Sequence, residues 1–324
     1  MKNATTVMTT LGSRCYTMRR ARKGLLQALL VVVVLVVFSF GSTHAQESPG
    51  LLVSADWLSE HLSDPDVLIL HAGMQRTRYH SGHIPGARFL DMSQIIWDGD
   101  PAWGFEITSQ ADIEAALENA GVTEDHHLVV YAANPLYASR LFMTLEVMGL
   151  EGRVSMLDGG FGGWQEDARE VSMDDPDVVP GNIELALQSD ILVSADWINE
   201  RLNIDTVALI DARPDNEYTG EDGGLGGRGN PGHIPGGVQM YWENLIESRP
   251  VPRLHERSEL RTLFNDAGAD DGDIVVAYCM VGMRASFTYF AARLLGYETK
   301  FYDGSWRDWG AREDLPYVTG TSPH

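Results

Sequence analysis

Cysteine is scarce in this chain, which has only Cys15 and Cys279 among its 324 residues. Cys15 lies in an N-terminal segment that we expect to be removed. The remaining chain then holds a single thiol and cannot form an internal disulfide, so its fold must depend on a buried core. A chain of this length has enough residues for two domains of ordinary size.

Positive charge is also scarce, because 24 basic residues stand against 46 acidic ones and the formal net charge is −22. Six of the basic residues precede position 46, which leaves a formal charge of −28 on the rest of the chain. This balance argues against nucleic acid and against an anionic membrane surface as partners. An anionic substrate must therefore be drawn in by a local positive site. We expect a soluble monomer.

The first 45 residues have the composition of a secretory signal. Basic residues extend to Lys23, an apolar run covers Leu25 to Phe40, and the small residue Ala45 follows. The 16-residue run is shorter than the roughly 18 residues expected of a spanning helix. We predict cleavage after Ala45 and export to the periplasm or the medium, by the general or the twin-arginine route. An uncleaved membrane anchor is the alternative.

Three short segments occur twice, which predicts two domains of about 120 residues each. The pairs are Leu51–Leu58 with Ile191–Ile198, His83–Gly86 with His233–Gly236, and Asp158–Gly160 with Asp303–Ser305. We place the signal at 1–45, the first domain at 46–165, an acidic linker at 166–190, the second domain at 191–312, and a polar tail at 313–324. We expect the tail to wrap around the second domain or to fray.

Short apolar segments alternate with helical segments in both halves. The expected strands are Val67–Leu70, Val129–Tyr131, Val207–Ile210 and Ile274–Val276, and the expected helices are Ile113–Gly121, Leu141–Leu150, Leu260–Gly268 and Phe287–Gly296. This alternation predicts an α/β fold in which each domain is a parallel sheet with helices on both faces.

Cys279 lies where an apolar strand passes through a short loop into a helix. Loop amides and the positive end of the helix dipole favour the thiolate, which is the nucleophilic form. Gly282 allows tight curvature and Arg284 adds a cation, so the loop suits an anion. The expected substrate-binding residues of the loop are Met280, Val281, Gly282, Met283 and Arg284. The alternative is a buried structural cysteine.

The corresponding loop of the first half lacks this chemistry. Leu128–Ser139 aligns without a gap on Val275–Ser286, and Ala132, Pro135 and Tyr137 replace Cys279, Gly282 and Arg284. The first domain therefore keeps the scaffold and has lost the thiol, the glycine and the cation together. We predict one active domain and one inactive domain.

The chain resembles a tandem-domain rhodanese, a sulfurtransferase with an inactive N-terminal and a catalytic C-terminal domain. The likeness is carried by the two His-Ile-Pro-Gly segments, Asp211-Ala212-Arg213 with Glu217-Tyr218 and Gly220, the Cys279 loop, and Asp303-Gly304-Ser305 with Trp309. It implies that Cys279 carries a persulfide, that Arg213 helps to hold an anionic sulfur donor, and that a thiophilic acceptor such as cyanide or a thiol receives the sulfur. No metal or organic cofactor is implied.

Donor and reaction class have alternatives. Two arginines near the thiol, Arg213 and Arg284, favour thiosulfate, while 3-mercaptopyruvate is the second candidate donor. A phosphatase or arsenate reductase usually has its arginine six residues after the cysteine, whereas Arg284 is five after Cys279. A non-enzymatic persulfide carrier is a further alternative. The Gly224–Gly229 segment matches a dinucleotide pattern but lacks the strand-to-helix setting that this function needs.

Overall fold

The computed structural model describes residues 49–96, 105–166, 168–202, 204–222, 229–247 and 251–324. The expected signal at 1–45 and residues 224–228 of the glycine-rich segment lie outside these ranges. Among the described residues, no helix combines the length and the apolar character that crossing a membrane requires.

The first domain is built on a parallel sheet in the order β1-β5-β4-β2-β3. Its strands are β1 (Leu52–Val53), β2 (Val67–Gly73), β3 (Arg88–Asp91), β4 (His127–Tyr131) and β5 (Val154–Leu157). Its helices are α2 (Ala55–Glu60), α3 (Arg76–His80), α4 (Gln110–Asn119), α5 (Pro135–Val147) and α6 (Gly160–Glu166), with a short 3-10 helix η1 (Met92–Gln94).

The second domain repeats this arrangement with the strand order β7-β6-β8-β9, which corresponds to β3-β2-β4-β5, and with parallel pairing throughout. Its strands are β6 (Val207–Asp211), β7 (Val238–Gln239), β8 (Ile274–Tyr278) and β9 (Glu298–Phe301). Its helices are α7 (Ala195–Asn199), α8 (Asp215–Thr219), α9 (Arg257–Asp266), α10 (Ala285–Leu295) and α11 (Ser305–Trp309), with the 3-10 helix η2 (Trp242–Leu245).

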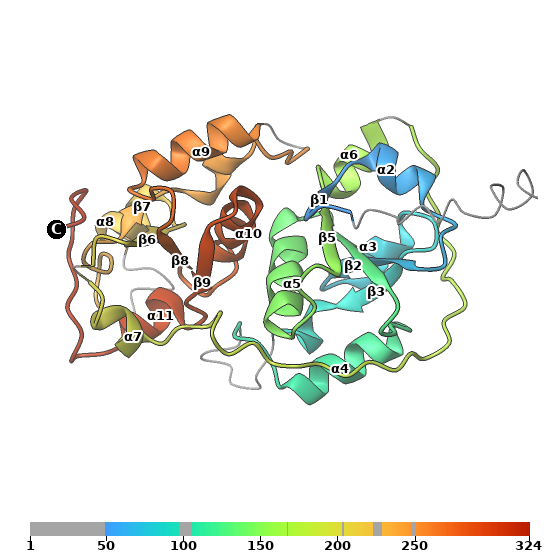
Figure 1. The fold of residues 1–324 in the computed structure, drawn as a ribbon, viewed down its shortest axis with the longest axis horizontal. Helices are drawn as coiled ribbons and strands as arrows, with labels where there is room; N and C mark the ends of the chain where they lie inside the picture. The colour runs from blue at the N-terminus through green and yellow to red at the C-terminus, as the bar shows by residue number, and fades with distance from the viewer. Residues whose placement is uncertain (1–48, 97–104, 167, 203, 223–228, 248–250) are drawn as a thin grey trace, which may run out of the picture. The chain divides into compact units, whose positions relative to one another are not determined.

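Alternate residues of each strand pack against helices on opposite faces of the sheet, because side chains of a strand point in turn to either side. In the second domain, Leu209 and Val276 pack with Trp306 and Trp309 on one face. Their neighbours along the strands pack with α9 and α10 on the other face. The predicted α/β fold with helices on both faces is confirmed (Figure 1).

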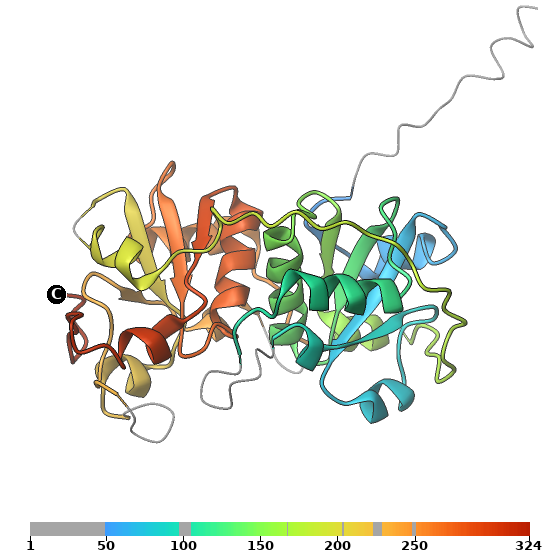
Figure 2. The ribbon, with the colours of Figure 1, turned by 90° about the horizontal axis from the view of Figure 1, so that it is seen from below.

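Helices α5 and α10 join the two domains through one continuous core, and they lie side by side in Figures 1 and 2. Phe142 meets Phe290 edge to face, with ring centroids 4.8 Å apart. The hydroxyls of Ser139 and Ser286 are 2.9 Å apart. Every residue of α5 from Ala138 onward is buried, as is typical of a helix covered on all sides.

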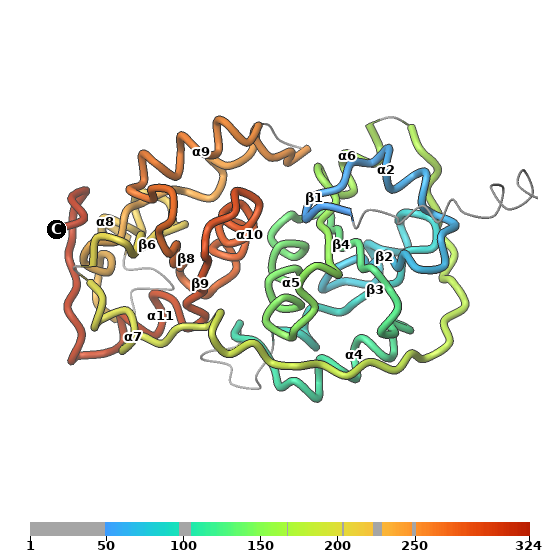
Figure 3. Tube along the Cα trace, in the orientation of Figure 1, coloured from blue at the N-terminus to red at the C-terminus, as the bar shows by residue number. Residues whose placement is uncertain are grey.

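The segment between the domains is packed rather than a loose linker. Ile183 and Leu185 are buried, and the Leu185 amide donates a 3.1 Å hydrogen bond to Glu114 of α4. Figure 3 shows this part of the chain running along α4. The C-terminal tail wraps around the second domain, where Val318 and His233 exchange two backbone hydrogen bonds of 2.9 and 3.0 Å.

His71 of β2 is a buried imidazole in an aromatic cluster. Its ring lies against Tyr79, Phe89 and Tyr131, and its Nδ1 has no hydrogen-bond partner among the described residues. Burial, followed by the nearby His83, lowers the pKa of His71 from 6.5 to about 4. The unfolded chain therefore binds a proton more readily than the folded chain between these two values, and the folded state loses stability as the pH falls through them.

We predict that replacing His71 with Phe removes part of this pH dependence. For the native chain, His71 alone should lower the free energy of unfolding by roughly 1 kcal/mol between pH 7.5 and 5.5. The His71→Phe variant should lose less stability over that interval, as measured by urea denaturation at both pH values. An identical loss in both proteins would contradict this assignment.

Candidate active site

Cys279 follows the last residue of β8 directly, and the loop Met280–Arg284 leads from it into α10. Its side chain is fully buried and free. The predicted sequence of strand, cysteine, loop and helix is confirmed. Met280 packs into the core, while Val281, Met283 and Arg284 are partly exposed. Solvent therefore approaches the site over the latter part of the loop.

Helix α11 holds the loop from its other side. The amide of Cys279 donates to the Ser305 hydroxyl at 3.2 Å, and the amides of Trp306 and Arg307 donate to the carbonyls of Cys279 and Met280 at 2.9 and 3.0 Å. Ser305 has a φ of 53°, which is an uncommon backbone conformation for a residue with a side chain. The surrounding structure must hold it there, so the start of α11 is a fixed support for the thiol.

The backbone amides of the loop are free to bind an anion. None of the five amides of Met280 to Arg284 donates a hydrogen bond to another described residue. Consecutive amides in a turn form a concave receptor for negative charge. Such donors can stabilise negative charge that develops nearby, and we expect them to favour the thiolate of Cys279.

Gly282 is required at the centre of this loop for two reasons. Its φ of +81° favours a residue without a side chain. A Cβ at this position would also lie 2.7 Å from Nη1 of Arg140 and 3.1 Å from Oδ1 of Asp303. Arg140 belongs to the first domain, so both domains contact the loop.

Arg284 is already paired. Its Nη1 and Nη2 donate to the two carboxylate oxygens of Glu217 at 2.8 and 2.7 Å, and both side chains are about four-fifths buried, with exposures of 20% and 18%. Burial alone would lower the pKa of Arg284, but the hydrogen bonds to Glu217 and the nearby charge of Cys279 raise it overall. Arg284 thus stays charged, and most of its charge is met by Glu217.

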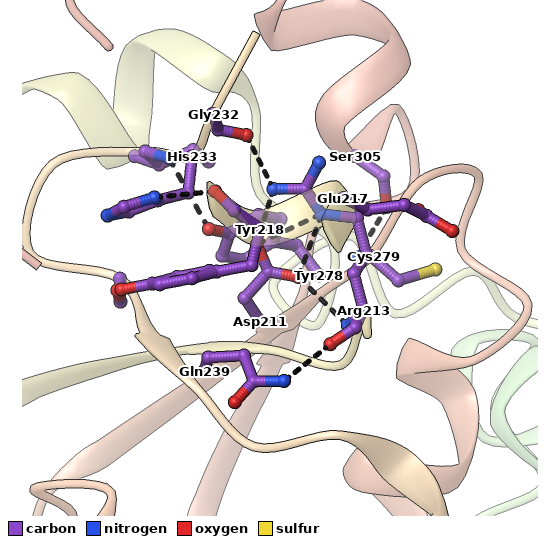
Figure 4. A network of polar contacts seen from close by, with 12 residues as sticks. Asp211, Arg213, Glu217, Tyr218, Gly232, His233, Gln239, Tyr278, Cys279 and Ser305 are labelled. Atoms are coloured by element: carbon purple, nitrogen blue, oxygen red, sulfur yellow. Dashed lines mark hydrogen bonds and ion pairs between the residues drawn. The ribbon is translucent and has the colours of Figure 1, made fainter. Parts of the chain in front are cut away.

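Arg213 lies behind the site and not at its surface. Its Nε and Nη2 donate to Asp211 at 2.6 to 3.0 Å, and Nη2 also donates to the Gly232 carbonyl at 2.8 Å. Figure 4 shows this network, with the sulfur of Cys279 pointing away from it. Of its nitrogens only Nη1 has no partner among the described residues. The binding of a donor by Arg213 stays a prediction and rests on Nη1.

The two histidines of the His-Ile-Pro-Gly segments are structural. His83 stacks on Tyr79 and His233 stacks on Tyr218, each with ring centroids 3.7 Å apart, and both histidines are fully buried. Burial lowers the pKa of His233 and favours its neutral form. Among the described residues, no cluster of histidine, cysteine and acidic side chains could hold a metal ion.

The corresponding loop of the first domain keeps the backbone and lacks the chemistry. Ala132 is buried at the position of the thiol, and its carbonyl accepts from the Phe161 amide at 3.2 Å, as Cys279 accepts from Trp306. Pro135 begins α5 and has no amide hydrogen to donate. Tyr137 borders a cavity of about 260 Å³ where the second domain has Arg284. This cavity has no thiol beside it in the described part of the chain, because Ala132 stands at the position of Cys279.

Three residues around the site were given no role from the sequence: Glu217, Ser305 and Arg140. Glu217 and Ser305 stand in the Asp211–Tyr218 and Asp303–Ser305 motifs, so a sequence signal existed for both. Nothing in the sequence pointed to Arg140, because its contact with Gly282 joins two domains.

A comparison with protein families identifies two rhodanese-like domains, at residues 54–167 and 194–312. These matches cover most of the chain and contain every strand of the two sheets described above except β1. The protein therefore belongs to the rhodanese family, its fold is that of a rhodanese-family sulfurtransferase, and the Cys279 loop lies in the second matched domain.

Relatives with different names match at similar levels. The chain is 31% identical to the sulfur carrier protein TtuD of Thermus thermophilus, covering 98% of that protein and 84% of this chain. It is also 31% identical to the 3-mercaptopyruvate sulfurtransferase of Escherichia coli and to the thiosulfate sulfurtransferase of Pseudomonas aeruginosa, covering 96% of each and 82% of this chain.

Solved structures agree with this family. The E. coli 3-mercaptopyruvate enzyme matches with a TM-score of 0.70 and 29% identity, over 80% of this chain and 99% of that one. EanB, solved with a cysteine persulfide and ergothioneine, matches with a TM-score of 0.75 and 25% identity, over 84% of this chain and 71% of that one.

We predict that Gly282→Ala impairs the site and that Gly268→Ala does not. Both glycines have a φ of +81°, so either alanine costs roughly 1–2 kcal/mol of backbone strain. Only at Gly282 would the new Cβ also meet a side chain and a carboxylate, since nothing lies within 4 Å at Gly268. Sulfur-transfer kcat/KM should fall at least about tenfold in Gly282→Ala alone. Equal activity in the two variants would contradict the role of Gly282.

Proposed function

We propose that this protein moves a sulfane sulfur from a small anionic donor to a thiophilic acceptor through a persulfide on Cys279. The observation that supports this best is the free thiol at the end of β8, followed by five loop amides that have no acceptor among the described residues. The persulfide in the EanB structure supports the same intermediate.

The reaction needs no external oxidant. The Cys279 thiolate attacks the outer sulfur of thiosulfate, a new S–S bond forms, and sulfite leaves with the electron pair of the old bond. Cyanide or a thiolate then attacks the terminal sulfur, and the Cys279 thiolate departs. Loop amides stabilise the negative charge at each step, and the buried setting strengthens these interactions.

Thiosulfate is the donor that the sequence favours, because two arginines were expected beside the thiol. In the structure, each arginine meets a carboxylate: Arg284 meets Glu217 and Arg213 meets Asp211. This pairing reduces the positive charge offered to a dianion and supports 3-mercaptopyruvate, with its single carboxylate, as the second candidate. The relatives bear both names.

A non-enzymatic carrier is the remaining alternative, and the likeness to TtuD supports it. A carrier would accept the persulfide and release it only to a protein partner. The buried thiol is compatible with either function, because a small acceptor and a partner's thiolate both need only the terminal sulfur. Turnover with a free donor and cyanide separates the two.

We predict that Cys279→Ala abolishes sulfur transfer and leaves the fold intact, because a thiol is replaced by a hydrogen in a buried site with no large loss of volume. Mass spectrometry after donor treatment should show one added sulfur on the native protein and none on the variant. Circular dichroism should show the same fold for both. Undiminished cyanolysis by the variant would end the proposal.

We predict opposite effects from the two members of the Arg284 pair. Arg284→Ala should raise the KM for thiosulfate at least about tenfold, which corresponds to about 1.4 kcal/mol. Glu217→Gln should lower that KM several-fold, because Arg284 then has its charge free for the dianion. Steady-state cyanolysis with both donors measures these effects.

Glu221→Gln is the matched control for this comparison, since Glu221 is an exposed acid in the same region of the chain. It changes the net charge equally and should leave both KM values unchanged. Two results would assign 3-mercaptopyruvate instead: a higher kcat/KM for that donor, and thiosulfate turnover that Arg284→Ala does not affect.

A further inference from the structure

Arg140 is a buried arginine of the first domain with unused hydrogen-bond donors. Its side chain on α5 has no solvent exposure. Nη2 donates to the Phe105 carbonyl at 2.8 Å and to Asp303 at 2.6 Å, while Nε and Nη1 have no partner among the described residues. Burying a guanidinium with unpaired donors costs free energy, so its retention calls for a reason.

The position of Arg140 relative to the Cys279 loop suggests that reason. Its Nη1 lies 2.7 Å from where a Cβ of Gly282 would be. Its partner Asp303, which also accepts from the Ile107 amide at 2.8 Å, stands two residues before Ser305. Because Ser305 accepts from the Cys279 amide, Arg140 touches the loop directly at Gly282 and indirectly through Asp303.

The two domains meet almost symmetrically, and Arg140 breaks that symmetry. The contact between Ser139 and Ser286 joins residues 147 apart, the same offset that aligns the two loops. Asp158 accepts from the Leu254 amide at 3.2 Å, as Asp303 accepts from Ile107. At the position equivalent to Arg140, however, the second domain has Phe287, which borders the loop around Ala132.

A buried cation therefore faces the loop that has the thiol, and a phenyl ring faces the loop that lacks it. We propose that Arg140 is a positioning residue for the active site of the other domain. It holds Gly282 in place and neutralises Asp303, so that the loop amides stay directed at an anionic sulfur. This inference rests on the proposed role of Cys279 as the nucleophile.

The charge balance around the loop gives the expected effect of removing Arg140. Without it, the Asp303 carboxylate loses its counter-ion close to the loop, 3.1 Å from where a Cβ of Gly282 would be. Like charges disfavour one another's ionised forms, so a thiolate at Cys279 should become less favourable. Charged and titratable groups around the loop come from every element packed against it: Asp211, Arg213, Glu217, Tyr278, Arg284, Asp303, Arg307 and Asp308.

The test compares four variants: Arg140→Met, Arg140→Lys, the double variant Arg140→Met with Asp303→Asn, and Arg253→Met. Arg253 is the matched control, because it pairs with Asp158 beside the inactive loop at 3.6 Å. The readout is the rate of Cys279 alkylation by iodoacetamide as a function of pH, located by peptide mass spectrometry. This rate requires no sulfur donor.

We expect Arg140→Met to shift the alkylation profile to higher pH by about one unit and Arg140→Lys to shift it less. The double variant should have a profile close to that of the native protein, since it removes the unpaired carboxylate as well. Arg253→Met should leave the profile unchanged. An unshifted profile in Arg140→Met, or an equal shift in Arg253→Met, would show that Arg140 serves only the interface.

Failure of the proposed function can be told apart from failure of the Arg140 proposal, because the two affect different measurements. If Cys279 forms no persulfide with any donor, the cyanolysis and mass measurements fail for the native protein, while the alkylation profiles still report on Arg140. If Arg140→Met does not fold, Arg140→Lys keeps the charge and most of the volume. A Lys variant that folds and is shifted by a full unit, or a double variant that is shifted by as much, would overturn the charge argument.

Discussion

The carboxylate of Asp303 connects the two domains to the chemistry of the site. It accepts from Arg140 and from the Ile107 amide, both in the first domain, and its own backbone leads into Ser305, which binds the Cys279 amide. A buried carboxylate is tolerated only when its charge and hydrogen-bonding capacity are met. The loop is thus supported by contacts from a domain whose own corresponding loop has no thiol.

Electrostatics at the site depends more on dipoles than on free charges. The two arginines that the sequence led us to expect beside the thiol, Arg213 and Arg284, each face a carboxylate, and the chain as a whole is strongly acidic. The loop amides are neutral groups fixed by the backbone, so they bind an anion without carrying a charge that the surrounding acids would compensate. They also need no reorganisation when sulfur arrives, because Gly282 and the start of α11 already hold them.

The sequence predicted the fold well because strand and helix periodicities are local. It predicted the strand, loop and helix around Cys279 because this pattern is local as well. Directions of side chains are not local. Arg213 follows a strand, yet only the folded structure shows that it turns to Asp211. The packed linker left a weak signal, since Ile183 and Leu185 alternate with polar residues in an otherwise acidic stretch, whereas the contact of Arg140 with Gly282 left none.

The near-symmetric meeting of α5 and α10 has the form of a two-fold dimer interface, in which each partner offers the same surface. In a homodimer, any substitution appears on both sides of the axis, so Arg140 would bring a second buried cation with it. Joining the halves in one chain removes that constraint and keeps the partners at high effective concentration. Each half can then change alone, so equivalent positions on the two sides of the interface can hold different residues. Arg140 and Phe287 are such a pair.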